Sequence, residues 1–498
     1  MATTKPHITT SMIATLLLAC ASAAAGTGGR SPITDKVLLP AGVDNSLLKY
    51  FPPVFAQLGG SCAQASTVGY VFTYEMNRLL DRDASASPAN RFNYLYTWNL
   101  LNGGSDDGTF STDGYSAGYF NGIMTEEDFP KQTSAYQFSW ASGYNKYFNA
   151  MHYRVASTIS IEVADTEGIY KLKHYLYDGG EEGEPGGIVS FGSAAGNWRF
   201  DDDYLGPSET GYHCMLTKLA TEGAHAMTIV GYDDTVECLT DDGQLTYGAF
   251  IAVNSWGVFY HDRGRYYLPY HFFLDRSGDG ILDMDVTGVN VKYEDPTVVF
   301  KINMDYTSRD DISFKMGIAD KPYSELPSNN FPVSIFNNAG GDNGMQGALG
   351  PSEIELGLNF SDYASGTDRM DEPKFFLIVS RNRRGNSAGE GSVTSVEVYD
   401  YRNDPFHPTV YSSPDADGSP LKWGDNIFGI PTTPLKYTSA SPVRWLDKYG
   451  KPLRDPFVVR TSSGRYAKIR FTGYDPSTGK ITFEYVLSGD EEGSFVRK

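Results

Sequence analysis

The stretch Gln57-Leu58-Gly59-Gly60-Ser61-Cys62-Ala63-Gln64-Ala65-Ser66 joins a glycine-containing turn to the start of a helix. Gly59 and Gly60 allow a tight turn, and Ser61 has a side chain suited to the N-cap position. The apolar residues that follow recur at three- and four-residue steps, typical of an amphipathic helix of roughly five turns; they are Ala65, Val68, Phe72, Met76 and Leu79. We therefore expect Cys62 in the first helical turn, where the helix dipole stabilises a thiolate.

Two later stretches supply partners for a reactive thiol. His225 lies in a strand-like run that ends at Tyr232, and Asn254 directly follows the strand-like run 248–253. The acidic turn 241–243 between the two runs favours a hairpin that sets His225 and Asn254 side by side. A neutral imidazole can take the proton of a thiol, and an amide can fix the orientation of that imidazole. A lone cysteine at a helix start is more often a small buried residue, so the histidine and the asparagine carry the catalytic interpretation.

In the order of its motifs the chain resembles the papain-like cysteine peptidases. The motifs are Gln57 followed by Gly60-Ser61-Cys62, His225-Ala226 followed by Val230-Gly231-Tyr232, Asn254-Ser255-Trp256-Gly257, and Gly264-Arg265-Tyr266-Tyr267-Leu268-Pro269. Between them, 112–115 and 122–130 look like the family's region around its substrate-binding glycine pair, and 186–191 looks like the strand that opens its second half. The resemblance covers about residues 50 to 270, and an ordered set of motifs is more specific than any one of them.

The resemblance implies a role for each residue of the set. Cys62 would be the nucleophile, His225 the base, and Asn254 the amide that orients the base. Gln57 would donate from its side chain to the oxyanion, together with the backbone N–H of Cys62. Trp256 would shield the hydrogen bond between His225 and Asn254 from water. Such an enzyme needs no organic cofactor.

Three positions depart from the family pattern. Ala63 follows the nucleophile where relatives usually carry tryptophan, and Gln57 precedes Cys62 by one residue fewer than usual. Asp113 replaces the first glycine of the substrate-binding pair, and Gly114 corresponds to the second. Asp113 and Gly114 are therefore the predicted substrate-binding residues, on a loop at a reshaped cleft.

These residues favour an exported cysteine peptidase that hydrolyses peptide or protein substrates. Two alternatives stay open. The papain-like half could be an inactive scaffold of a surface binding protein, although such scaffolds normally lose one of the three catalytic residues. The same acyl-enzyme could also serve an exopeptidase or a transpeptidase, because either water or an amine can resolve it.

The acidic composition of the chain limits the classes of molecule that it can bind. The 498 residues include 61 acidic and 41 basic ones, which give a net charge of −20, and the sequence pI is about 4.8. An acidic chain is a poor partner for nucleic acid or anionic membrane surfaces. The sequence does not indicate an oligomeric state.

The first 25 residues are typical of an export signal. Lys5 precedes a short apolar run from Met12 to Leu18, and small residues suited to cleavage follow. Leu17-Leu18-Ala19-Cys20 also resembles a bacterial lipobox, in which Cys20 would be lipidated and would provide the membrane anchor. An ordinary secretory peptide and a lipoprotein signal are equally favoured, and both predict an extracellular or periplasmic location.

The predicted fold class is α+β with an all-β C-terminal region. After the signal (1–25) and a linker (26–48), a two-lobed papain-like domain over 49–290 would combine a helical lobe with a β-rich lobe. Short strand-like runs separated by turn residues predict a β-sandwich-like domain over 291–402. A Pro-rich connection and a small β module would fill 403–498.

Two features outside the catalytic set remain. Cys214 and Cys238 flank the His225 strand and are either a disulfide or two buried thiols. The stretch 275–283 places oxygen ligands at alternate positions in the manner of a calcium loop, but Val286 stands where the closing glutamate belongs. A weak structural calcium site and an acidic surface turn are both compatible with it; the ligands would be Asp275, Ser277, Asp279 and Asp283.

Overall fold

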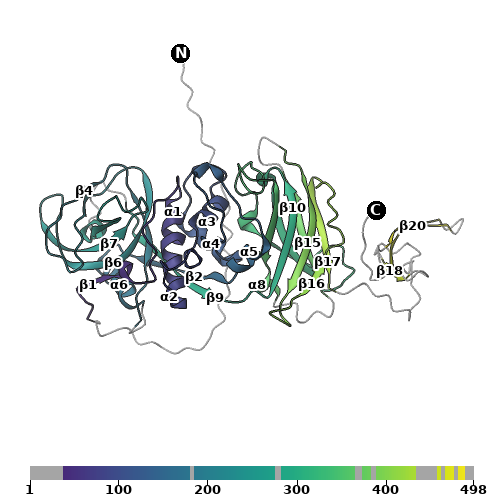
Figure 1. Cartoon of the computed structure of the whole chain (residues 1–498), viewed down its shortest axis with the longest axis horizontal. Coiled ribbons are helices and arrows are strands. Elements are labelled where there is room, and N and C mark those ends of the chain that lie inside the picture. Colours follow the sequence, from purple (N-terminus) through teal and green to yellow (C-terminus); the bar gives the residue numbers. More distant parts are fainter. Residues whose placement is uncertain are drawn as a thin grey trace, which may run out of the picture. The chain divides into compact units, whose positions relative to one another are not determined.

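The computed structural model (Figure 1) describes a mixed α/β structure with several sheets and few helices. The described residues are 38–179, 184–274, 282–364, 373–382, 388–432, 457–460, 466–475 and 480–487. The predicted signal over 1–25, with Cys20, and most of the predicted linker lie outside them. In the described part of the chain, none of the helices combines the length and apolar character needed to cross a bilayer.

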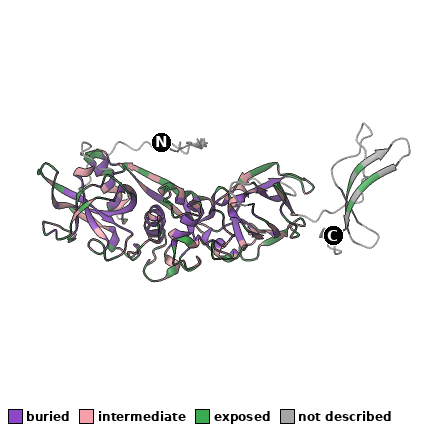
Figure 2. Cartoon of the chain, turned by 90° about the horizontal axis from the view of Figure 1, so that it is seen from above, coloured by how far each residue is buried: buried purple, intermediate pink, exposed green. Residues whose placement is uncertain are grey.

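One continuous helical stretch starts at Cys62, as predicted. It consists of α1 (Cys62–Gln64), the π-helical segment η2 (Ala65–Phe72) and α2 (Thr73–Leu80). Every residue of η2 is buried, so this part of the helix is covered on all sides (Figure 2). The predicted stripe is buried up to Met76, whereas Leu79 is 52% exposed. The helix itself ends at Leu80, because Asp81, in the left-handed region with φ 51°, turns the chain away.

Shorter helices surround this one. The α-helices are α3 (Tyr94–Leu101), α4 (Ser111–Asn121), α5 (Tyr144–Ala150), α6 (Thr166–Asp178), α7 (His271–Leu274) and α8 (Ser361–Ala364). The 3-10 turns are η1 (Asn45–Leu47), η3 (Pro88–Asn90), η4 (Ala135–Gln137), η5 (Arg309–Asp311) and η6 (Ser334–Phe336). Side-chain caps start two of the helices: Asn93 accepts from the N–H of Leu95 in α3, and Asp165 accepts from the N–H of Gly168 in α6.

Within the described residues, nine strands form the largest sheet. They are β1 (Gly42–Asp44), β2 (Tyr153–Glu162), β3 (Val189–Ala194), β4 (Arg199–Asp201), β5 (Met215–Lys218), β6 (Ala224–Leu239), β7 (Leu245–Val253), β8 (Arg265–Pro269) and β9 (Asp285–Tyr293). Their order is β2-β9-β3-β6-β7-β8-β5-β4, with β1 also paired to β6. The predicted hairpin is confirmed, since β6 and β7 pair antiparallel up to Leu239 and Leu245, around the acidic turn.

Two four-stranded antiparallel sheets follow along the chain. One has the order β13 (Glu353–Asn359), β10 (Val298–Tyr306), β15 (Gly391–Asp400), β16 (Thr409–Ser412). The other has the order β12 (Asn329–Pro332), β11 (Ile312–Ala319), β14 (Lys374–Arg381), β17 (Gly424–Pro431). Phe300 of β10 and Phe375 of β14 meet edge to face, 6.1 Å between ring centroids, so side chains from both sheets share one core.

The boundary predicted at residue 402 differs from the observed strand pairing. β16 pairs with β15, and β17 pairs with β14 along its whole length, so the stretch up to Pro431 belongs to these sheets. The prolines of 403–420 suggested a connection, but they flank β16 instead of interrupting it. The backbone groups on the second edge of β14 need hydrogen-bond partners, and β17 supplies them. The local composition of this stretch does not reveal that pairing.

The last described strands form a separate antiparallel sheet of β18 (Phe457–Arg460), β19 (Tyr466–Asp475) and β20 (Lys480–Leu487). β19 and β20 pair up to Asp475 and Lys480. The hairpin predicted for this stretch is therefore confirmed, although its turn lies outside the described residues.

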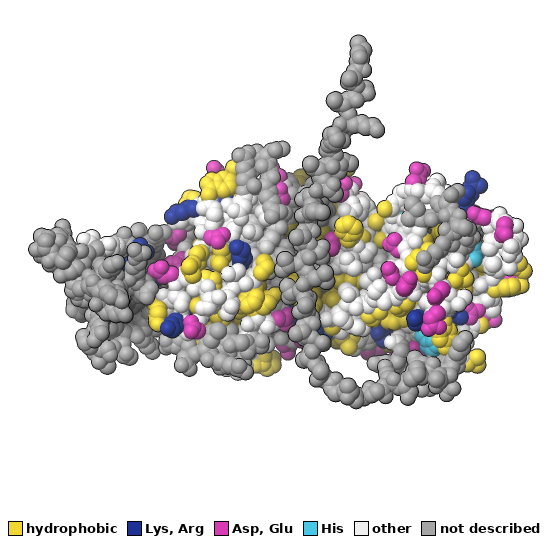
Figure 3. Space-filling view, turned by 180° about the vertical axis from the view of Figure 1, so that it is seen from behind, with side chains coloured by type: hydrophobic (Ala, Val, Ile, Leu, Met, Phe, Trp, Pro, Cys, Tyr) yellow, Lys and Arg dark blue, Asp and Glu magenta, His cyan; other side chains and the backbone are white. Residues whose placement is uncertain are grey.

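Acidic side chains are scattered over the molecular face in Figure 3, and the basic side chains visible there stand apart from one another. On this face the acidic excess of the sequence is therefore dispersed.

Arg309 ties the β-sheet region to the segment before α5. Its side chain is fully buried, donates to the carbonyl oxygens of Phe138 (2.9 Å) and Gly340 (2.5 Å), and lies 4.4 Å from the ring centroid of Trp140. Burial lowers the pKa of Arg309 to about 9. The guanidinium therefore depends on these contacts for its place in the core.

Arg309→Ala is expected to lower the free energy of unfolding by about 3 kcal/mol, because it removes a buried side chain that packs on Trp140 and the Arg309 donor of the Phe138 carbonyl, whereas the Gly340 carbonyl keeps Asn343 Nδ2 as a donor. Urea unfolding followed by tryptophan fluorescence measures the change. Arg199→Ala, which removes an exposed arginine of β4, is the matched control and should stay within about 0.5 kcal/mol of the parent protein. Equal stabilities of the two variants would contradict the anchoring role of Arg309.

Candidate active site

The turn before Cys62 is held by the side chain of a residue from a later part of the chain. Gly59 has φ +57°, and a side chain there would collide with the carboxylate of Asp106. The N–H of Gly60 donates to Asp106 Oδ1 at 2.7 Å. Ser61 stands at the N-cap position as predicted, but its hydroxyl donates to the carbonyl of Leu58 (2.7 Å) and does not cap the helix. Asp106 therefore holds the turn before the helix, whereas the Ser61 side chain caps none of the helix N–H groups.

Cys62 lies against strand β6. The backbone N–H groups of Ala226, Ala63 and Cys62 itself favour the thiolate and so act to lower the pKa of this thiol. Burial acts in the opposite direction and is the larger effect, so the pKa of Cys62 is raised. The lowered pKa expected from the helix dipole is thus wrong for the free protein, because removal of water from the sulfur outweighs the backbone dipoles.

His225 and Asn254 meet as predicted. His225 Nε2 lies 2.9 Å from Asn254 Oδ1, and the backbone N–H of Ser255 donates to the same oxygen at 2.7 Å. The Ser255 bond identifies the amide oxygen, so His225 must donate from Nε2 and carries its proton there when neutral. Its Nδ1 is then the basic nitrogen. Both side chains are buried, and burial lowers the pKa of His225 despite the opposing hydrogen bond to Asn254.

Two tryptophans cover this histidine. Trp256 stacks on His225 with 4.7 Å between ring centroids and 25° between the ring planes. Trp198, in the loop between β3 and β4, meets Trp256 edge to face at 5.4 Å and His225 at 6.3 Å. The predicted contact of Trp256 is present, whereas Trp198 was not predicted because no motif surrounds it.

Gln57 is bound to the Asn254-Ser255 segment. Its backbone N–H donates to the carbonyl of Ser255 (2.7 Å), and its Oε1 accepts from the Ser255 hydroxyl (2.5 Å). Its Nε2 donates to the carbonyl of Gly59 at 2.8 Å. A primary amide has two N–H bonds, so this contact uses one donor and leaves a second for a ligand oxygen.

Asp113 and Gly114 do not lie in a loop. Both belong to the first turn of α4, which starts at Ser111. A Cβ on Gly114 would lie 1.9 Å from Gln64 Oε1, so the side chain of Gln64 occupies the space a larger residue would need. Gln64 stands two residues after Cys62, which places Gly114 beside the helix start. Burial raises the pKa of Asp113.

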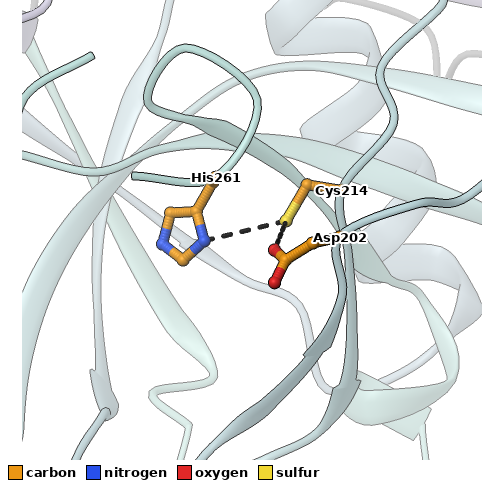
Figure 4. A group of neighbouring side chains, drawn as sticks. All are labelled: Asp202, Cys214 and His261. Atoms are coloured by element: carbon orange, nitrogen blue, oxygen red, sulfur yellow. Dashed lines mark hydrogen bonds between the residues drawn. The ribbon is translucent and has the colours of Figure 1, made fainter. Parts of the chain in front are cut away.

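His261 is a neighbour of the site that the sequence motifs did not predict. Its Nε2 lies 3.2 Å from Asn254 Nδ2, and its Nδ1 lies 3.7 Å from the sulfur of Cys214 (Figure 4). The pairing of Val253 with Arg265 puts Asn254 and His261 in one hairpin loop, which is the sequence signal that could have found it. His261 has φ 54°, a strained conformation for a histidine. Burial lowers its pKa to about 4.

Of the alternatives for Cys214 and Cys238, the structure has the two thiols. Among the described cysteines, Cys62, Cys214 and Cys238 are all free. The Cys214 thiol donates to Asp202 Oδ1 at 3.3 Å, whereas Cys238 lies near the carbonyl of Gly248 at 3.9 Å. The two sulfurs therefore have different surroundings.

The predicted calcium ligands Asp275, Ser277 and Asp279 lie outside the described residues. Asp283 is described: its N–H donates to the carbonyl of Gly192 at 2.8 Å, and burial raises the pKa of its carboxyl group. The carboxylate lies where a Cβ on Gly192 would stand. The calcium site stays a prediction.

No protein-family model and no curated protein sequence matches the chain. Among solved structures, the chain is similar to xylellain, a cysteine protease from Xylella fastidiosa (19% identity, TM-score 0.34), over 52% of this chain and 87% of that one. It is similar to procathepsin L 3 of the Tenebrio molitor larval midgut (16%, 0.34) over 52% and 73%. It is also similar to bromelain from Ananas comosus, solved with the E64 inhibitor (14%, 0.32), over 51% and 99%.

Proposed function

We propose that the chain is a cysteine peptidase that hydrolyses peptide bonds in peptide or protein substrates. The observation that carries the proposal is the hydrogen bond between His225 of β6 and Asn254, directly after β7, because β6 packs on the helix that starts at Cys62. We extend the proposal to a two-lobed papain-like domain followed by an all-β region, and to export, as the N-terminal sequence predicts.

In the proposed reaction, His225 Nδ1 takes the proton of the Cys62 thiol, and the sulfur attacks the carbonyl carbon of the substrate. The resulting oxyanion accepts hydrogen bonds from the Cys62 N–H and from the second N–H of Gln57 Nε2. His225 then gives its proton to the leaving amine, which breaks the C–N bond. Water, deprotonated by the same imidazole, hydrolyses the thioester and restores the thiol. Asn254 keeps Nε2 protonated and so keeps Nδ1 available throughout.

Labelling with an epoxide inhibitor of the E64 type, followed by peptide mass spectrometry, tests the proposal. One adduct per chain on Cys62 is expected, because the proposal gives this thiol both a base and oxyanion donors, whereas Cys214, although close to His261, is 1% exposed. Cys238 serves as the internal control and should stay unmodified. A folded, reduced protein that forms no adduct, or that is labelled equally at Cys238, would contradict the proposal.

Activity is expected to fall only when the pH drops below about 6.5, because His225 must be neutral to accept the thiol proton and burial lowers its pKa. The acid limb of kcat/KM, measured with a fluorogenic peptide, reports this pKa. Asn254→Asp places a carboxylate beside the imidazole, favours its charged form, and should move the limb upward by about one pH unit or more. A parent limb above pH 7, or a limb that Asn254→Asp does not move, would be inconsistent with this arrangement.

A further inference from the structure

Three potential metal ligands converge beside the candidate active site. Asp202 directly follows β4, Cys214 directly precedes β5, and His261 lies in the loop between β7 and β8. Their ligand atoms all lie within 4.8 Å of one another, with Cys214 Sγ at 3.3 Å from Asp202 Oδ1 and 3.7 Å from His261 Nδ1 (Figure 4). In the described part of the chain, this is the one group of three such side chains at this spacing.

The spacing suits a tetrahedral ion with a thiolate ligand. With a Zn–S distance of about 2.3 Å and Zn–N and Zn–O distances of about 2.0 Å, a tetrahedral zinc ion holds its sulfur about 3.5 Å from each of the other ligand atoms. The two observed separations, 3.3 and 3.7 Å, lie on either side of that value. Thiolate, imidazole and carboxylate together favour a zinc-class cation over calcium or magnesium, which prefer oxygen ligands alone.

The group of three side chains is open to solvent on one side and covered by aromatic rings on the other. Cys214 is 1% exposed and His261 is partly buried, whereas Asp202 is exposed, so an ion can enter past the carboxylate and keep water as its fourth ligand. Aromatic rings line the other side: Phe200 lies 4.3 Å and Tyr266 5.0 Å from the His261 ring, centroid to centroid. Such a shell limits the access of water to a metal site.

We propose that Asp202, Cys214 and His261 form a binding site for a zinc-class divalent cation, and that its occupancy opposes the catalytic arrangement of His225 and Asn254. The second part rests on the proposed function. The two parts are therefore tested by separate measurements.

The coupling follows from the hydrogen bonds of Asn254. Because the N–H of Ser255 donates to Oδ1, Nδ2 faces His261, and Nε2 of His261 must accept from it. The neutral His261 ring therefore carries its proton on Nδ1, the atom that faces Cys214. A metal ion bound at Nδ1 needs the lone pair of this nitrogen, which the proton occupies in the metal-free ring. The proton must therefore move to Nε2 of His261, and the Cys214 thiol releases its proton to solvent.

After this change two donors, His261 Nε2–H and Asn254 Nδ2–H, face each other at a contact that held a hydrogen bond. The Asn254 amide must then rotate or move away, and its Oδ1 no longer accepts the hydrogen bond from His225 Nε2. Metal binding and the orientation of the catalytic imidazole thus compete, and the competition is reciprocal.

Cobalt absorption tests the site without any enzyme activity. In the Cys62→Ala protein, titration with Co²⁺ should produce a thiolate-to-cobalt charge-transfer band that saturates at one ion per chain and disappears when Zn²⁺ is added. The band should be lost in Cys62→Ala/Cys214→Ser and kept in Cys62→Ala/Cys238→Ser, the matched control. Asp202→Asn, at an exposed position, should weaken cobalt binding about tenfold or more without a risk to folding. Absence of the band in the Cys62→Ala protein, or its survival in the Cys214→Ser variant, would overturn the site.

Peptidase assays with Zn²⁺ test the coupling, each variant being compared with its own metal-free rate. The Zn²⁺ concentration that halves the parent activity should rise at least about tenfold in Asp202→Asn and in Cys214→Ser. Equal sensitivity of all three proteins would mean that zinc acts at Cys62 and His225, and would overturn the coupling while the cobalt result stands. A parent protein without peptidase activity would refute the proposed function and the coupling, but not the metal site.

Discussion

The Cys62→Ala protein is expected to lose roughly 10⁴- to 10⁶-fold in kcat, because no other group in the site can form the thioester and only binding and oxyanion stabilisation remain. Its fold should be retained. Alanine is a good residue for a helix start, and the thiol is only partly buried, so the free energy of unfolding should change by about 1 kcal/mol or less. Initial rates with a fluorogenic peptide and thermal unfolding by circular dichroism measure the two effects.

Cys238→Ala is the matched control for this experiment. It removes a buried thiol from β6, the strand that carries His225, at a position outside the site. It should keep the parent activity while losing some stability. Activity retained by Cys62→Ala would exclude the mechanism, and equal losses in both variants would point to a structural effect.

His225→Ala is expected to lower kcat/KM by about 10²- to 10⁴-fold and to slow alkylation of Cys62 by a similar factor near neutral pH. The effect is large because burial raises the pKa of Cys62, so the thiol depends on a nearby base to lose its proton. The rate of reaction with iodoacetamide at pH 7 measures it. In the variant, the remaining alkylation should increase about tenfold per pH unit until the thiol ionises by itself.

His213→Ala controls for the loss of an imidazole. His213 is exposed and its ring contacts the carbonyl of Tyr204, so this variant should alkylate at the parent rate. An unchanged alkylation rate in His225→Ala would mean that another group activates Cys62.

Local signals in the sequence were enough to predict two parts of the candidate site. The helix that starts at Cys62 follows from two glycines and an apolar periodicity. Two strand-like runs around an acidic turn predict that His225 and Asn254 lie on one hairpin. The register near the site also depends on shifts in the pairing at Ile229/Gly231 and Asp233/Glu237, which the turn does not set. Each of these signals lies within a short stretch of chain, whereas the contact between the helix start and β6 joins distant stretches.

Other features depend on residues that are far apart in the sequence. The pKa of Cys62 depends on how deeply β6 and its neighbours bury the sulfur, and burial reverses the direction that the helix start implied. Ser61 makes no side-chain cap, and the turn before the helix is held by Asp106, 46 residues from Gly60. β17 joins β14 although its own stretch is rich in turn residues.

The sequence by itself thus determined that the thiol lies at a helix start and that the imidazole and the amide lie on one hairpin, because turn chemistry and hydrophobic periodicity act over a few residues. Only the tertiary structure decided the electrostatics of the thiol and the group of Asp202, Cys214 and His261, because desolvation and the convergence of separate loops depend on the whole packed fold.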